Sequence, residues 1–184
     1  MARRDNLYEA AFEAFLREET VPYIAVDETK RTLCPGHSLK SLDFLISPPQ
    51  GMRYLVDVKG RNFPTGSPGQ YWKNWLTAED LEALSEWEKA MGTGFVGLIV
   101  FAYRLTGRKT PLPWDQLFFF RGQWYGFLGV TRQNYQTWAK PISPKWQTLA
   151  IPTEEFRRQA RPLQEFLLPP VPAARCFQPL GLPR

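Results

Sequence analysis

The 184 residues are enough for one domain with a proper core, and two full domains would be cramped. Hydrophobic residues make up 43% and charged residues 22%, which is an ordinary globular composition. The net charge of +5 and the pI of about 9.3 suit a polyanionic partner such as nucleic acid.

Cysteine and histidine usage narrows the class of protein further. Cys34 and Cys176 are far apart and no CxxC motif occurs, which argues for a reducing compartment and against a disulfide scaffold or structural zinc. The single histidine, His37, excludes multi-histidine metal sites. No signal-peptide pattern follows the N-terminal MARRDN, and no apolar run is long enough to span a membrane. We therefore expect a cytoplasmic protein with no membrane partner.

The chain opens with a predicted helix. Asp5 or Asn6 can cap an amphipathic segment from about Leu7 to Glu18, whose apolar residues recur at helical spacing. Residues 21–27 then have the pattern of a strand, and the polar stretch 28–38 follows.

Two strand-like runs come next, SLDFLIS (41–47) and RYLVDVK (53–59). The Pro-Pro-Gln-Gly sequence between them predicts a turn, so we expect a β-hairpin. Residues 60–69 are rich in Gly and Pro, and we expect a loop there. A second helix then begins at Thr77, where Asp80 completes a pattern that resembles a capping box.

The remaining elements complete an α/β chain. Residues 95–103 are almost wholly apolar, which predicts a central strand joined to the hairpin by the helix as a crossover. Residues 116–129 predict another hairpin, 131–138 a short helix and 145–151 a strand. A last helix is expected from Thr153, and a proline-rich, extended or disordered tail over 168–184.

Three charged residues of the first hairpin are expected to converge. Asp57 and Lys59 are two residues apart on a strand, so they project on the same face. Asp43 lies on the preceding strand, close enough to meet them across the hairpin. Two charges inside an apolar strand are costly unless they have a task, whereas the competing Glu28-Thr29-Lys30 tripeptide leads into a polar loop. The alternative interpretation is that Asp57 and Lys59 form the solvated face of an edge strand.

This set of groups suits phosphodiester hydrolysis. Two carboxylates can bind Mg²⁺, with Mn²⁺ as an alternative, and the backbone carbonyl of Val58 can add a ligand. The metal polarises the phosphate and lowers the pKa of a bound water. Lys59 can orient that water or stabilise charge on the phosphate, and burial beside a metal would lower its pKa.

The arrangement resembles the PD-(D/E)xK nuclease superfamily, on the strength of Asp43 in LDFLI and of Asp57-Val58-Lys59 in YLVDVKG. The resemblance covers about residues 7–103. It implies a restriction-endonuclease-like or archaeal Holliday-junction-resolvase-like core with a central mixed β-sheet flanked by helices. It also implies a Mg²⁺-dependent endonuclease that acts on DNA, with RNA left open and homodimerisation by analogy.

The same resemblance assigns a further acid to the first helix. In YEAAFEAFLRE, Glu9 is the first choice as a catalytic and metal-binding residue, and Glu13 is the second. No proline immediately precedes Asp43, and no family motif follows residue 104. We therefore divide residues 1–167, as one nuclease-like domain, into a core (7–103) and a C-terminal hairpin and helix extension (104–167), followed by the tail.

Other polar groups are candidate nucleic-acid contacts: Lys30, Arg31, Arg61, Gln70, Lys73 and Asn74. Trp72 or Trp75 could stack on a base, or both could seal the core. Two alternatives to the enzyme are a catalytically inactive nuclease-fold module that binds nucleic acid or a protein, and a structural or partner-binding protein.

Overall fold

The computed structural model describes residues 6–27, 32–34, 37–49, 51–66, 71–143 and 145–167. Its helices are α1 (Leu7–Glu18), α2 (Ala78–Met91), α3 (Arg132–Trp138), α4 (Thr153–Gln159) and α5 (Gln164–Leu167), with a short 3-10 turn η2 (Trp114–Gln116). Its strands are β1 (Tyr23–Ala25), β2 (Thr32–Cys34), β3 (His37–Leu39), β4 (Phe44–Ile46), β5 (Arg53–Phe63), β6 (Leu76–Thr77), β7 (Phe95–Leu105), β8 (Phe118–Phe120), β9 (Gln123–Thr131), β10 (Lys140–Ser143), β11 (Thr148–Ala150) and β12 (Arg161–Pro162).

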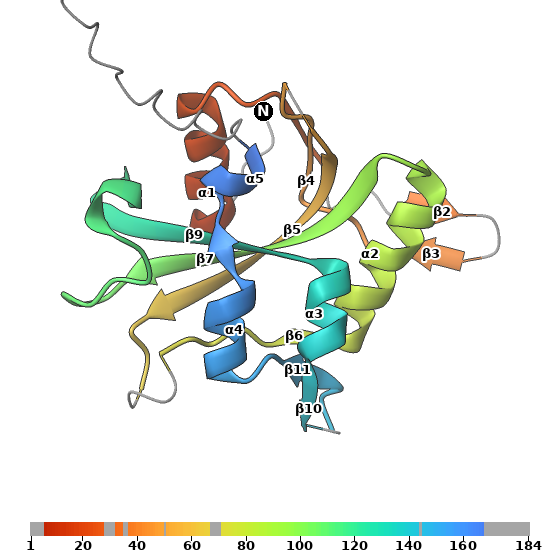
Figure 1. The fold of residues 1–184 in the computed structure, drawn as a ribbon. Coiled ribbons are helices and arrows are strands. Elements are labelled where there is room, and N and C mark those ends of the chain that lie inside the picture. The colour runs from red at the N-terminus through yellow and green to blue at the C-terminus, as the bar shows by residue number, and fades with distance from the viewer. Residues whose placement is uncertain are drawn as a thin grey trace, which may run out of the picture.

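A mixed sheet forms the centre of the molecule (Figure 1). Within the described residues it has seven strands in the order β1-β4-β5-β7-β9-β12, and β8 pairs with β9. β5 and β7 are parallel from Arg53↔Phe95 to Phe63↔Leu105, as expected for strands joined through α2. β4 pairs antiparallel with β5, which confirms the first hairpin.

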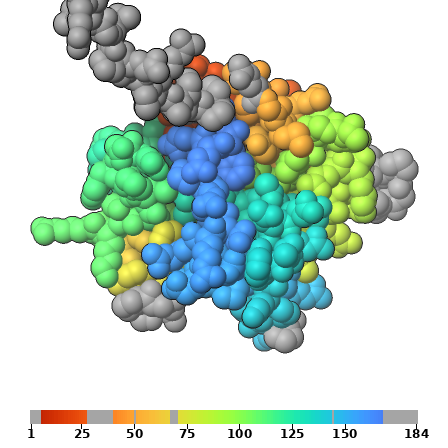
Figure 2. Space-filling view, in the orientation of Figure 1, coloured from red at the N-terminus to blue at the C-terminus, as the bar shows by residue number. Residues whose placement is uncertain are grey.

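Helices cover both faces of this sheet. α1 and α5 pack on one face, where Phe12 and Leu16 of α1 meet Val56 and Val100 of the sheet. On the other face, residues of α2, α3 and α4 pack against the alternate side chains of β5 and β7. In Figure 2 the blue segment that contains α4 and α5 crosses the front of the molecule, with the α3 and α2 segments beside it. The architecture is therefore three layers, with one hydrophobic core on each side of the sheet.

Local signals in the sequence set the ends of the two long helices. Asn6 caps α1, because its side chain accepts a hydrogen bond from the Tyr8 N–H at 3.1 Å. Thr77 and Asp80 form the expected capping box at the start of α2. Gly92, at φ 76°, ends α2 in a backbone conformation that favours glycine.

The structure differs from the expectation after Lys59. The predicted loop over 60–69 is wrong at its start, because β5 continues to Phe63. The extra residues pair with β7 as far as Leu105, so long-range pairing overrides the local Gly and Pro signals. The polar stretch 28–38 also contains the short strands β2 and β3, which pair with each other.

The C-terminal elements follow the expected order with one addition. β8 and β9 form the second hairpin, turning at Arg121 and Gly122. β10 is an unexpected partner of β11, and together with β6 they make a separate small sheet. The proline-rich tail lies outside the described residues. No helix among the described residues is both long and apolar enough to cross a membrane.

Candidate active site

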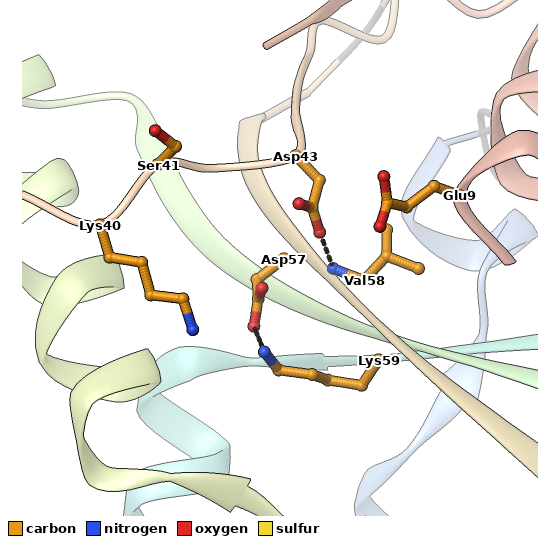
Figure 3. Close-up of a pocket in the computed structure, with 7 residues that line it drawn as sticks. All are labelled: Glu9, Lys40, Ser41, Asp43, Asp57, Val58 and Lys59. Atoms are coloured by element: carbon orange, nitrogen blue, oxygen red, sulfur yellow. Dashed lines mark hydrogen bonds and ion pairs between the residues drawn. The ribbon is translucent and has the colours of Figure 1, made fainter. Parts of the chain in front are cut away.

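A pocket of about 250 Å³ opens where β4 meets β5. Figure 3 shows the side chains around it: Glu9, Lys40, Ser41, Asp43, Asp57, Val58 and Lys59. Asp43 comes from the segment leading into β4, Asp57 and Lys59 from β5, and Glu9 from α1. The four residues that the sequence analysis placed at a catalytic site thus line the same pocket.

The β4–β5 hairpin fixes the position of Asp43. Its backbone N–H donates to the Val56 carbonyl at 3.0 Å, which continues the strand pairing just before β4 begins. Its carboxylate then accepts the N–H of Val58 at 2.5 Å. Asp43 therefore satisfies a backbone N–H and also points into the pocket (Figure 3).

Asp57 is a buried acid in the middle of β5, with 8% of its surface exposed. Burial raises the pKa of its carboxyl above the usual range, although the nearby Lys59 ammonium opposes that shift. Its Oδ2 forms an ion pair with Lys59 Nζ at 2.7 Å. Such an oxygen can accept a further positively charged partner.

Lys59 lies between two carboxylates. Its Nζ is 2.7 Å from Asp57 Oδ2 and 3.1 Å from Asp80 Oδ1. Burial alone would lower the pKa of Lys59, but the two carboxylates outweigh burial and raise it. In this metal-free arrangement the pKa of Lys59 is therefore raised, and the expected lowering beside a bound metal stays a prediction.

Asp80 is the residue that the sequence analysis missed at this site. It is 4% exposed at the first turn of α2, and its carboxylate pairs with Lys40 and Lys59. Burial alone would raise its pKa, but the lysines and the Thr77 N–H lower it to about 2. The capping-box pattern did single out Asp80, but only as a helix cap, and no signal indicated that its other oxygen would face Lys59.

The structure separates the two candidate acids of α1. Glu9 is buried, lines the pocket and accepts a hydrogen bond from the side chain of Asn6, the helix cap. Glu13 lies one turn further along and pairs with Arg17 at 2.8 Å and with the Tyr23 hydroxyl at 2.9 Å. Glu13 does not line the pocket, so the second choice is not supported.

The donor set of the pocket fits a hard divalent cation. Carboxylate and carbonyl oxygens are the ligands that Mg²⁺ and Mn²⁺ take, and Glu9, Asp43 and Asp57 are three carboxylates on the lining of the pocket. In the described part of the chain, no three His, Cys, Asp or Glu side chains form a ready-made metal cluster. Each acid has a separate partner instead: Asn6 for Glu9, the Val58 N–H for Asp43 and Lys59 for Asp57.

The structure describes three of the six candidate nucleic-acid contacts: Arg61, Lys73 and Asn74. Lys30, Arg31 and Gln70 lie outside the described residues. Asn74 is wrong as a contact, because it is 3% exposed and its amide pairs with the backbone of Ile151 at 2.9 and 2.8 Å.

Arg61 is also engaged within the protein. Its guanidinium donates to the carbonyls of Gly60 and Trp75 and lies 4.2 Å from the centre of the Trp75 ring. Burial lowers its pKa. Lys73 is half-buried, and its carbonyl accepts the Tyr103 hydroxyl at 2.9 Å.

The two tryptophans of this segment have different environments. Trp72 packs edge-on against Phe63 and Tyr103, so it seals the core. Trp75 is 41% exposed, with Arg61 over its ring. Of the two candidates for base stacking, Trp75 is therefore the one with an accessible ring.

The mixed sheet with helices on both faces and the pocket at the β4–β5 hairpin define a restriction-endonuclease-like core. Among solved structures, the fold is similar to that of Hjc, a Holliday junction resolvase from the archaeal hyperthermophile Archaeoglobus fulgidus. The TM-score is 0.51 at 12% sequence identity, over 87% of this chain and 97% of that chain. At this identity the likeness concerns the fold. No protein-family model and no curated protein sequence matches the chain.

Proposed function

We propose that this protein is a metal-dependent endonuclease of the PD-(D/E)xK type that hydrolyses phosphodiester bonds of DNA. The observation that carries the proposal is the convergence of Asp43, Asp57 and Lys59 in one pocket, with Glu9 beside them. Three of these groups are buried acids. Burying a carboxylate costs free energy, and a purely structural role at the protein surface would not require that cost.

The residues divide into a cation-binding set and a substrate set. Asp43 and Asp57 hold Mg²⁺, or Mn²⁺ in its place, with the Val58 carbonyl and Glu9 assisting. The bound metal supplies a Lewis acid for the phosphate and a water of lowered pKa. Lys59 orients the attacking water or stabilises the negative charge that develops on the phosphate.

Two properties of the whole molecule, its net charge and its fold, support DNA as the substrate. The chain carries a net charge of +5, which favours association with a polyanion. The fold is that of a protein described as a Holliday junction resolvase, whose substrate is branched DNA by its name. Branched DNA is therefore one of the substrates to test, together with plasmid and linear DNA.

The test is cleavage of these three DNAs with Mg²⁺, with Mn²⁺ and with EDTA. We expect the wild type to cut at least one of them only when metal is present. Asp57→Ala and Lys59→Ala should each lower the rate by about 100-fold or more, because each removes a group that acts on the reacting phosphate. Glu9→Ala should lower it as well.

Glu13→Ala is the matched control on the same helix, and it should cut like the wild type because Glu13 does not line the pocket. DNA binding with no cleavage under any metal condition would instead support the inactive nuclease-fold module. Cleavage that persists in EDTA, or in Asp57→Ala, would contradict the proposed chemistry.

A further inference from the structure

The Lys59 ammonium has two carboxylate partners that come from different elements. Asp57 is two residues away on β5, and its Oδ2 is 2.7 Å from Lys59 Nζ. Asp80 is at the start of α2, and its Oδ1 is 3.1 Å from the same nitrogen. Since an ammonium has three N–H donors, Lys59 can interact with both acids together.

The two partners differ in what else they do. Under the proposed function, Asp57 must offer its oxygens to a divalent cation, and Lys59 occupies the vicinity of Oδ2. Cation and ammonium carry like charges and compete for that oxygen. Asp80 does not line the pocket, so its carboxylate is free of this competition.

Asp80 is also held firmly in place. The Thr77 N–H donates to its Oδ2 at 2.8 Å through the capping box, so the cap of α2 fixes the carboxylate. Its Oδ1 pairs with Lys40 as well as with Lys59. With its pKa lowered to about 2, Asp80 is a permanent negative charge at neutral pH.

We propose that Asp80 is a positioning residue that holds the Lys59 ammonium in the pocket and draws it off Asp57, so that Asp57 is available to a divalent cation. This inference rests on the proposed function, because it assumes that the pocket binds such a cation. Without Asp80, Asp57 becomes the one counter-charge within reach of Lys59 among its two observed partners, and competition for Asp57 Oδ2 increases.

The test is a calorimetric titration of Mn²⁺ alone, without DNA, into four folded proteins. These are the wild type, Asp80→Asn, Lys59→Met and the double variant, each first checked by near-ultraviolet circular dichroism. We expect Asp80→Asn to weaken Mn²⁺ binding by about fivefold or more in the presence of Lys59. In the Lys59→Met background, Asp80→Asn should weaken Mn²⁺ binding by less than about twofold.

Thr77→Ala is the control for the helix cap, since it removes a capping group and leaves the carboxylate. It should bind Mn²⁺ as the wild type does. An equal loss from Asp80→Asn in both backgrounds would overturn the inference, because Asp80 would then act through its charge alone. No Mn²⁺ binding by the wild type would overturn the proposed function and this inference together.

A second set of variants, made at Lys40 and Lys59, leaves the cap of α2 unchanged. Lys40 is the other cation on Asp80, and its side chain is 42% exposed, so Lys40→Met should fold. Removing Lys40 leaves Asp80 to Lys59, and we expect tighter Mn²⁺ binding by about twofold or more. Lys40 also lines the pocket and acts on Asp57 directly, so part of the gain should remain in the Lys59→Met background. A gain as large there as in the presence of Lys59 would overturn the inference.

Discussion

At the scale of single residues, Asp43 joins the stability of the hairpin to the chemistry of the pocket. Its carboxylate accepts the buried Val58 N–H at 2.5 Å. Asp43→Ala should lower the free energy of unfolding by about 1–3 kcal/mol, because that N–H loses its acceptor. Asp43→Asn keeps an acceptor oxygen and should restore most of the stability, measured by urea denaturation, without restoring Mn²⁺ binding. Equal stability of the Ala and Asn variants would contradict this division.

The sequence could locate Asp43, Asp57 and Lys59 because a hairpin leaves few ways to arrange adjacent strands. Asp57 and Lys59 share a face through the two-residue period of a strand, and the turn brings Asp43 alongside. Asp80 could not be assigned to the site in the same way, since its ion pair with Lys59 joins residues on separate elements. Nothing in the local sequence of Lys40 indicates that it faces Asp80.

At the scale of elements, the start of α2 should show a distinct pH dependence. Asp80 has a folded-state pKa of about 2, below the 3.8 that is usual for an aspartate, so its full contribution to stability is present above pH 3.8. This contribution, about 2 kcal/mol, is lost as the pH falls from about 4 through about 2. In urea denaturation, the free energy of unfolding should fall more with decreasing pH in the wild type than in Asp80→Asn. Parallel pH profiles of the two proteins would refute it.

Gly60 on β5 leaves room for Tyr8 of α1 to pack against the strand. A Cβ at Gly60 would lie 2.3 Å from Cδ2 of the Tyr8 ring, whose hydroxyl is fixed by Asn62 at 3.1 Å. Gly60→Ala should therefore lower the free energy of unfolding by about 1–3 kcal/mol and shift the helix that carries Glu9. Gly107→Ala is the control, because its nearest neighbour would be Pro64 Cδ at 3.8 Å. Similar thermal unfolding of both variants would argue against this close contact.

Element prediction succeeded where the signals are local and failed where pairing is distant. Of the two caps offered for α1, the structure shows Asn6, and Thr77 caps α2 as predicted. The end of β5 was missed, because Gly60 and Pro64 indicate a loop. The pairing of Phe63 with Leu105 on β7 keeps the strand extended, and the amino-acid pattern does not encode that partner.

At the scale of the whole molecule, the basic charge should govern DNA affinity. With a net charge of +5, binding should release counterions from the phosphate backbone. Fluorescence anisotropy in EDTA, where the proposed cleavage does not occur, should show affinity falling by about tenfold or more between 50 and 200 mM salt. An affinity that does not change with salt would show that phosphate contacts do not dominate binding.

The apolar run 95–103 predicts a central strand covered on both faces, and the resemblance to the nuclease superfamily implies that the sheet is mixed. The structure confirms that class, and it shows that β5 and β7, which are joined by α2, are parallel. The small sheet of β10, β11 and β6 was not predicted, since it joins short segments that are remote in the chain. The division between a core and an extension at residue 104 stays a prediction.

The central claim is that Asp43 and Asp57 hold one divalent cation. The most direct measurement is anomalous diffraction from crystals soaked in Mn²⁺, for the wild type and for Asp57→Asn. We predict one anomalous peak within coordination distance of both carboxylates in the wild type, and its loss in the variant. An anomalous peak at another place in the protein would contradict the claim. So would a pocket that has no peak at saturating Mn²⁺ and in which Lys59 still pairs with Asp57.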